Sequence, residues 1–176
     1  MKKEVLFVTQ AGAIAALYVV LTFIANSLGL ASGDVQIRFS EALTILPFFT
    51  PAAIPGLFIG CFLSNILCQC IIWDIIFGSL ATLLGALGTY LIRKKAPEWC
   101  ACIPPIIANM LIIPFILVYA YGVPGIASVL GVEIKGIPVL ICMLTVGLGE
   151  VISCGILGTL PLKVLKKYRR QLFPNS

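Results

Sequence analysis

A series of long apolar runs constrains this chain more than any other feature. The first run, 5–31, exceeds the ~20 apolar residues that a helix needs to cross a bilayer. Because 60% of the 176 residues are hydrophobic and only 11% are charged, the composition excludes an ordinary soluble domain. We therefore expect a single transmembrane domain over residues 1–176, embedded in a lipid bilayer.

Short breaks divide the chain into further apolar segments, from which we expect an all-α bundle of six transmembrane helices. The expected spans are approximately 5–31, 38–49, 52–70, 74–91, 100–121 and 137–164. Proline-containing breaks such as Thr50-Pro51 and Ala96-Pro97 mark their limits. The segment 38–49 is too short to cross alone, so we expect it to be tilted or packed among longer helices.

The basic residues predict the orientation. All but two of the 12 Lys and Arg residues lie at the N-terminus, at 93–95, or at 163–170. Six spans place these regions on one side, which is the cytoplasm by the positive-inside rule. The positive charge is thus a topology signal. A nucleic-acid-binding surface would need a basic face beside a polar domain, and the sequence has none.

Motifs that carry chemistry are few. The seven cysteines have no histidine to complete a zinc site, so we expect no metal ion. No nucleophile–base pair, phosphate-binding loop or dinucleotide motif is present, so neither an enzyme nor a bound cofactor is expected. Active transport would draw its energy from another subunit or from an ion gradient.

Glu150 is a candidate functional residue because an acid in the middle of a span is costly. Its neighbours three and four positions away are Val146, Gly147, Ser153 and Cys154. This small-residue face should turn Glu150 toward the bundle interior, either as a structural carboxyl or as a ligand contact. Asn109, in the middle of 100–121, either bonds to Glu150 structurally or faces a polar ligand with it.

Asp74 begins the segment 74–91 beside Trp73. Its carboxylate either stabilises the helix N-terminus or lies at the mouth of a pocket. In the second case Trp73 or Phe77 would offer a stacking platform. Trp73 fits better in the aromatic belt at a membrane interface.

The segment 34–41 is unusually polar for this chain. Arg38 and Glu41 are three residues apart, so on a helix they would form an ion pair. Alternatively the segment, with Gln36, forms a ligand-binding loop or lid.

Small residues form a stripe on the first span. Ala11, Gly12, Ala15 and Ala16 make two overlapping small-xxx-small pairs. Such a stripe allows another helix to approach closely, either within the bundle or from a partner protein.

Three stretches resemble the QueT family. They are DVQIRFSEALTILPFFTPAAIPGLFIGCFLSN (34–65), DIIFGSLATLLGALGTYLIRKK (74–95) and VGLGE (146–150). The resemblance implies a six-helix S component of an energy-coupling factor (ECF) transporter in a prokaryotic cell membrane, with cytoplasmic termini. It further implies docking on a transmembrane coupling subunit through an A-x-x-x-A stripe, which Ala11 and Ala15 match, and two separate ATPase subunits.

The family implies a queuosine precursor, a 7-deazaguanine such as queuine, preQ1 or preQ0, as the substrate. Its N1–H and exocyclic amine could both be accepted by the carboxylate of Glu150 or Asp74. Asn109 could meet the remaining polar group, and Trp73 or Phe77 could stack on the base. An aminomethyl group would favour a second acid.

Two alternatives stay open at this point. The protein could be a stand-alone secondary carrier in which Glu150 couples transport to protons. It could also be an S component for a different vitamin, because riboflavin, thiamine and biotin carriers share the implied fold.

Overall fold

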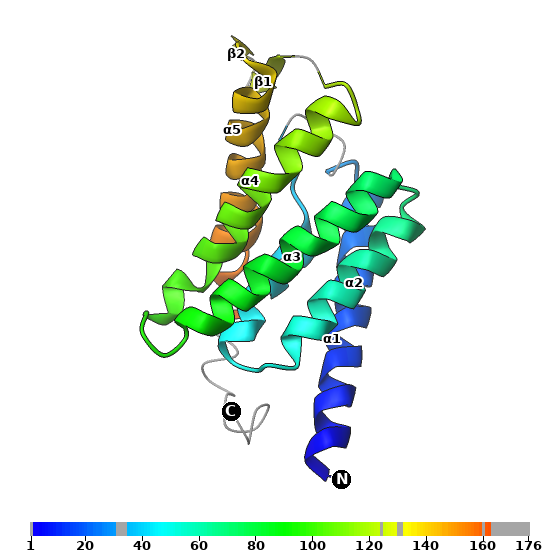
Figure 1. The fold of residues 1–176 in the computed structure, drawn as a ribbon, viewed down its shortest axis with the longest axis vertical. Helices are drawn as coiled ribbons and strands as arrows, with labels where there is room; N and C mark the ends of the chain where they lie inside the picture. Colours follow the sequence, from blue (N-terminus) through cyan, green and yellow to red (C-terminus); the bar gives the residue numbers. More distant parts are fainter. Residues whose placement is uncertain (1, 31–34, 124, 130–131, 160, 163–176) are drawn as a thin grey trace.

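The computed structural model describes residues 2–30, 35–123, 125–129, 132–159 and 161–162, which fold mainly as helices (Figure 1). The α-helices are α1 (Lys2–Ser27), α2 (Ala53–Leu67), α3 (Ile72–Ile92), α4 (Ile103–Tyr119) and α5 (Pro138–Glu150). Two 3₁₀ helices, η1 (Phe39–Phe48) and η2 (Glu98–Cys102), precede α2 and α4, and the π-helical turn η3 (Val151–Ile156) continues α5.

Within these residues, four helices are long and apolar enough to cross a membrane. They are Lys3–Ser27, Ile72–Ile92, Glu98–Tyr119 and Pro138–Ile156. Two further apolar helices, Phe39–Phe48 and Ala53–Leu67, are shorter. The expected helical membrane bundle is therefore supported, and four of the helices in the described residues have the length of a span. The end of the last expected span, at 160 and 163–164, lies outside the described residues.

The short helix η1 is packed among the longer helices, as its length predicted. Most of its side chains are buried, and Leu43 and Leu46 pack against Ile14 and Tyr18 of α1 and Leu57 of α2. A helix with so many apolar side chains is stable when they are enclosed by other helices. Its 3₁₀ rise of ~2.0 Å per residue also carries the chain further per residue than an α-helix would.

A short hairpin, which the sequence did not predict, connects α4 to α5. Strand β1 (Ile126–Val129) pairs antiparallel with β2 (Val132–Lys135). It lies at the end of the bundle where α1, α2 and α4 finish and α3 and α5 begin (Figure 1). We call this the hairpin end. The opposite end holds the start of α1 and the basic run 93–95 between α3 and η2.

Glycines let the helices approach closely. A Cβ atom on Gly60 of α2 would lie 2.8 Å from Cβ of Tyr18 and 3.0 Å from the carbonyl oxygen of Ala15. A Cβ on Gly85 of α3 would lie 2.7 Å from Cα of Pro105 in α4. Such backbone contact through small residues is typical of helix packing in membranes.

Replacing Gly85 by alanine is expected to destabilise the bundle. The new methyl group would meet the Pro105 backbone, and overpacking of this kind costs about 1–3 kcal/mol. The thermal unfolding midpoint in detergent should fall by several degrees. Gly12→Ala is the matched control, because nothing lies within 4 Å of its Cβ position, and it should unfold no earlier than the wild type. Equal midpoints for Gly85→Ala and wild type would contradict the close α3–α4 contact.

Candidate functional site

Two adjoining cavities enter the bundle from the hairpin end. The larger, of about 250 Å³, is lined by Thr22, Asn26, Gln36, Arg38, Asn65, Cys68, Cys70, Asp74, Ile113, Leu117, Tyr121 and Val123. The smaller, of about 20 Å³, is lined by Gln36, Arg38, Glu41, Gly78, Thr82, Asn109, Ile113, Val146 and Glu150. The smaller cavity lies deeper than the larger one. The residues of α3 and α4 that line it are one to two turns further from the hairpin end than those that line the larger cavity.

Asp74 is the acid of the larger cavity. It lies in the first turn of α3, where the helix dipole favours a carboxylate, and its side chain is only 6% exposed. The Tyr121 hydroxyl donates to Asp74 Oδ2 at 3.4 Å, and Asn65 Nδ2 donates to the Asp74 backbone carbonyl at 3.2 Å. Asp74 is not the N-cap of α3, which is Ile71, and no side chain caps this helix start by a hydrogen bond. Its carboxylate lines the cavity instead, from a position in the first turn.

Groups around Asp74 have altered acidity. Burial, followed by the charge of Asp74, raises the pKa of the Cys70 thiol to about 11. The same two causes raise the pKa of the Tyr121 hydroxyl. Both groups therefore stay protonated at neutral pH, and the Tyr121 hydroxyl remains a hydrogen-bond donor.

The smaller cavity contains two buried acids. Glu41 is 2% exposed and Glu150 is 8% exposed. The Tyr18 hydroxyl donates to Glu41 Oε1 at 2.6 Å, and Asn109 Nδ2 donates to Glu150 Oε1 at 2.8 Å. Oε2 of each acid has no hydrogen-bond partner among the described residues. Each carboxylate is thus oriented by one partner and keeps its second oxygen available.

Arg38 lines both cavities but does not form the expected ion pair. In the described part of the chain it makes no salt bridge with Glu41, and its Nη2 donates to Gln36 Oε1 at 3.4 Å. Asp74 and Glu41 are both near enough to interact with it electrostatically. The guanidinium therefore lies between the acids of the two cavities without being held by either.

The segment 35–38 is fastened to α5 and η3. The Arg38 backbone N–H donates to Ser153 Oγ at 3.1 Å. Gly149 contacts the Gln36 carbonyl so closely that any Cβ there would collide with it. This contact explains how a polar segment passes into the bundle and brings Gln36 and Arg38 to the cavities. Asp34, the first residue of the expected loop or lid, lies outside the described residues.

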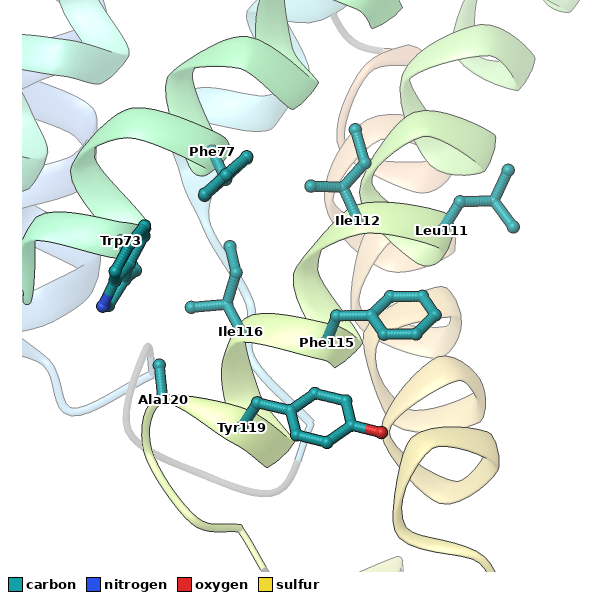
Figure 2. A pocket seen from close by; sticks show the side chains of 8 residues that line it. All are labelled: Trp73, Phe77, Leu111, Ile112, Phe115, Ile116, Tyr119 and Ala120. Carbon is teal, nitrogen blue, oxygen red and sulfur yellow. The ribbon is translucent and has the colours of Figure 1, made fainter.

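Trp73 and Phe77 do not line either polar cavity. They stack on each other at 6.0 Å and face α4 across a separate apolar groove of about 610 Å³ (Figure 2). Leu111, Ile112, Phe115, Ile116, Tyr119 and Ala120 form its other wall (Figure 2). Trp73 is 54% exposed, as expected for the aromatic belt. The structure therefore does not bring these rings into the cavity that Asp74 lines, because Asp74 lies on a different face of α3.

The small-residue stripe of α1 divides between two faces. Ala15 is buried against Gly60 of α2, and the Ala11 carbonyl faces Gly56. Gly12 and Ala16 are exposed. Ala11 and Ala15 thus pack inside the bundle, which agrees with one of the two interpretations. Gly12 and Ala16 remain accessible to a partner.

Sequence reasoning missed several residues of the cavities. Asn65 lies within an apolar segment, so the rule that flagged Asn109 could have identified it. Tyr18 and Tyr121 carried no comparable signal, since an isolated tyrosine in an apolar chain is ordinary. Their roles depend on contacts with Glu41 and Asp74, 23 and 47 residues away.

The long apolar helices indicate a multi-pass membrane protein, and polar cavities open at one end of its bundle. The chain belongs to the QueT transporter family, which it matches over residues 8–167. This match confirms the predicted family, and with the apolar helices it supports a multi-pass membrane protein.

One relative, from Lactococcus lactis subsp. cremoris (strain MG1363), is named Queuosine precursor transporter QueT. It is 37% identical over 88 residues, which cover 49% of this chain and 51% of the relative. The chain thus spans about half the length of the relative that it matches. No solved structure matches the chain.

Proposed function

We propose that this protein is the substrate-binding S component of an ATP-driven ECF-type importer, and that it captures a queuosine precursor of the 7-deazaguanine type. The observation that carries the proposal is the cavity of about 250 Å³ with buried Asp74 on its wall. The family match and the name of the Lactococcus relative support the substrate class.

The proposed topology has six spans in a prokaryotic cell membrane and cytoplasmic termini. The basic run 93–95 lies opposite the hairpin end, so the positive-inside rule directs the cavities outward. The short helices η1 and α2 would complete the six, with η1 enclosed by its neighbours. Substrate would then enter from outside at the hairpin end.

The larger cavity suits a single fused heterocycle. Its volume of about 250 Å³ is just below the ~300–1,000 Å³ of sites for drug-sized ligands. Asp74 would accept hydrogen bonds from the N1–H and the exocyclic amine of the base. Arg38 or Gln36, both on the cavity wall, would donate to the neighbouring carbonyl oxygen.

Energy for import would come from partner subunits, because the sequence carries no phosphate-binding loop. One observation favours a second candidate, a proton-coupled carrier: Glu150 is buried and its Oε2 has no partner among the described residues. Uptake into vesicles separates the two candidates. The first requires ATP and the partner subunits, whereas the second requires only a pH gradient.

Cysteine protection provides the binding test. Cys68 and Cys70 line the larger cavity, and Cys100 lies at the opposite end. A bound 7-deazaguanine is expected to slow maleimide alkylation of Cys68 and Cys70, measured by peptide mass spectrometry, and to leave Cys100 unchanged. Without ligand, Cys70 alkylation should rise with pH toward about 11, because only the thiolate reacts.

If Cys68 and Cys70 are alkylated at the same rate with and without a saturating concentration of the 7-deazaguanine, this placement of the site is contradicted. Mass spectrometry of the ligand retained by the purified protein identifies the substrate directly. A retained riboflavin, thiamine or biotin would assign the protein to another vitamin and overturn the proposed substrate.

A further inference from the structure

The smaller cavity has features that the recognition of a base does not use. Glu41 Oε2 and Glu150 Oε2 are both buried and both lack a partner among the described residues. A buried polar atom without a hydrogen bond is unusual and costly, and more so when it is charged. Both acids line the same space of about 20 Å³, enough for one water-sized group.

Acidic side chains outnumber basic ones in the two cavities. Asp74, Glu41 and Glu150 line them, and Arg38 is the one cation on the described walls. With a neutral ligand these buried acids would favour their uncharged forms, because an uncompensated charge in a water-poor interior is unfavourable. A ligand with one positive charge would offset part of their negative charge.

The shape and the available atoms favour an ammonium group over a metal ion. Mg²⁺ requires about six oxygen ligands, whereas a primary ammonium donates only three hydrogen bonds. Glu41 Oε2 and Glu150 Oε2 could accept two of these bonds. The Tyr18 and Asn109 hydrogen bonds hold the carboxylates by their other oxygens, so both acceptors are already oriented.

The cavities are arranged for a base that carries a short arm. Their walls share Gln36, Arg38 and Ile113, so the smaller cavity continues the larger one. We propose that Glu41 and Glu150 form a subsite for a protonated amine on a short side arm of the substrate, while the heterocycle occupies the larger cavity beside Asp74. This inference rests on the proposed function, and it makes these two acids the residues that distinguish cationic from neutral substrates.

Two probes that differ only in the arm test this subsite. They are 7-aminomethyl-7-deazaguanine, which is a cation at neutral pH, and 7-cyano-7-deazaguanine, which is neutral. Calorimetry on the purified full-length protein should show at least about tenfold tighter binding of the amine. Equal affinities would overturn the amine subsite and leave the proposed function intact. Binding of neither probe would overturn both.

The variants Glu41→Gln and Glu150→Gln locate the subsite. Each should weaken binding of the aminomethyl probe about 10- to 150-fold, the effect of losing one charged hydrogen bond. Each should weaken binding of the cyano probe much less, because a neutral nitrile makes no charged hydrogen bond with either carboxylate. A purely structural role would weaken both probes together.

Asp74→Asn is the matched comparison, because it contacts the shared heterocycle and should weaken both probes equally. If the wild type prefers the amine but both Gln variants keep that preference unchanged, the assignment to Glu41 and Glu150 is wrong. The wild-type comparison of the two probes remains decisive if a variant fails to fold.

Discussion

Replacing Asp74 by asparagine is expected to lower the affinity for a 7-deazaguanine about 10- to 150-fold while the protein stays folded. The carboxylate offers acceptors to two donors of the base, whereas asparagine presents an N–H group to one of them. Losing a charged hydrogen bond costs about 1.5–3 kcal/mol, which corresponds to this range. Calorimetry with the purified protein measures the affinity, and thermal unfolding checks the fold.

Two control variants separate direct contact from indirect effects. Tyr121→Phe removes the hydroxyl that donates to Asp74 Oδ2 and should weaken binding only slightly. Trp73→Leu alters the separate apolar groove and should leave the affinity unchanged. Unchanged affinity in Asp74→Asn would remove Asp74 from the site. A large loss in Trp73→Leu would restore the stacking role that the structure argues against.

The contact between Glu150 and Asn109 was open to prediction from the sequence. Both are polar residues near the middle of apolar spans, and such residues turn toward the protein interior. Their hydrogen bond of 2.8 Å agrees with one of the two interpretations. The sequence could not show that Oε2 of Glu150 would lack a partner, because that depends on how three other segments pack around it.

Arg38 and Glu41 show why spacing alone misled. The ion-pair rule assumes that both residues belong to one helix. Arg38 instead has an extended backbone, with φ −115° and ψ 112°, and η1 begins only at Phe39. The Arg38 side chain is therefore not aligned with Glu41, whose partner Tyr18 comes from α1.

Trp73 and Phe77 lie outside the cavity of Asp74 for a different reason. A step of one residue along an α-helix rotates the side chain by about 100°. Asp74 and Gly78 face the interior of the bundle, so Trp73 and Phe77, one position earlier, face the groove on α4. Proximity in sequence to Asp74 gave their position along the axis of α3 correctly, but it did not give the face of the helix on which they lie.

The exposed part of the α1 stripe leads to the prediction with the largest effect. Gly12→Trp and Ala16→Trp are each expected to abolish ATP-driven uptake in reconstituted vesicles and to leave ligand binding by the isolated protein intact. Both residues are exposed, and nothing lies within 4 Å of a Cβ on Gly12, so the bundle itself can accept the ring. A coupling subunit that packs closely on the stripe could not accept the added ring, so docking would be lost.

Ala15→Trp should behave differently, because its side chain is buried against Gly60 and the ring would separate α1 from α2. We expect that variant to lose thermal stability and ligand binding together. Leu17→Trp is the matched control: Leu17 is 47% exposed and lies about 100° around the helix from Ala16, so uptake should continue. Normal uptake by Gly12→Trp and Ala16→Trp would mean that this face of α1 meets lipid. Loss of uptake in Leu17→Trp as well would mean that α1 tolerates no added bulk on any exposed face, and the docking surface would then extend beyond the small-residue stripe.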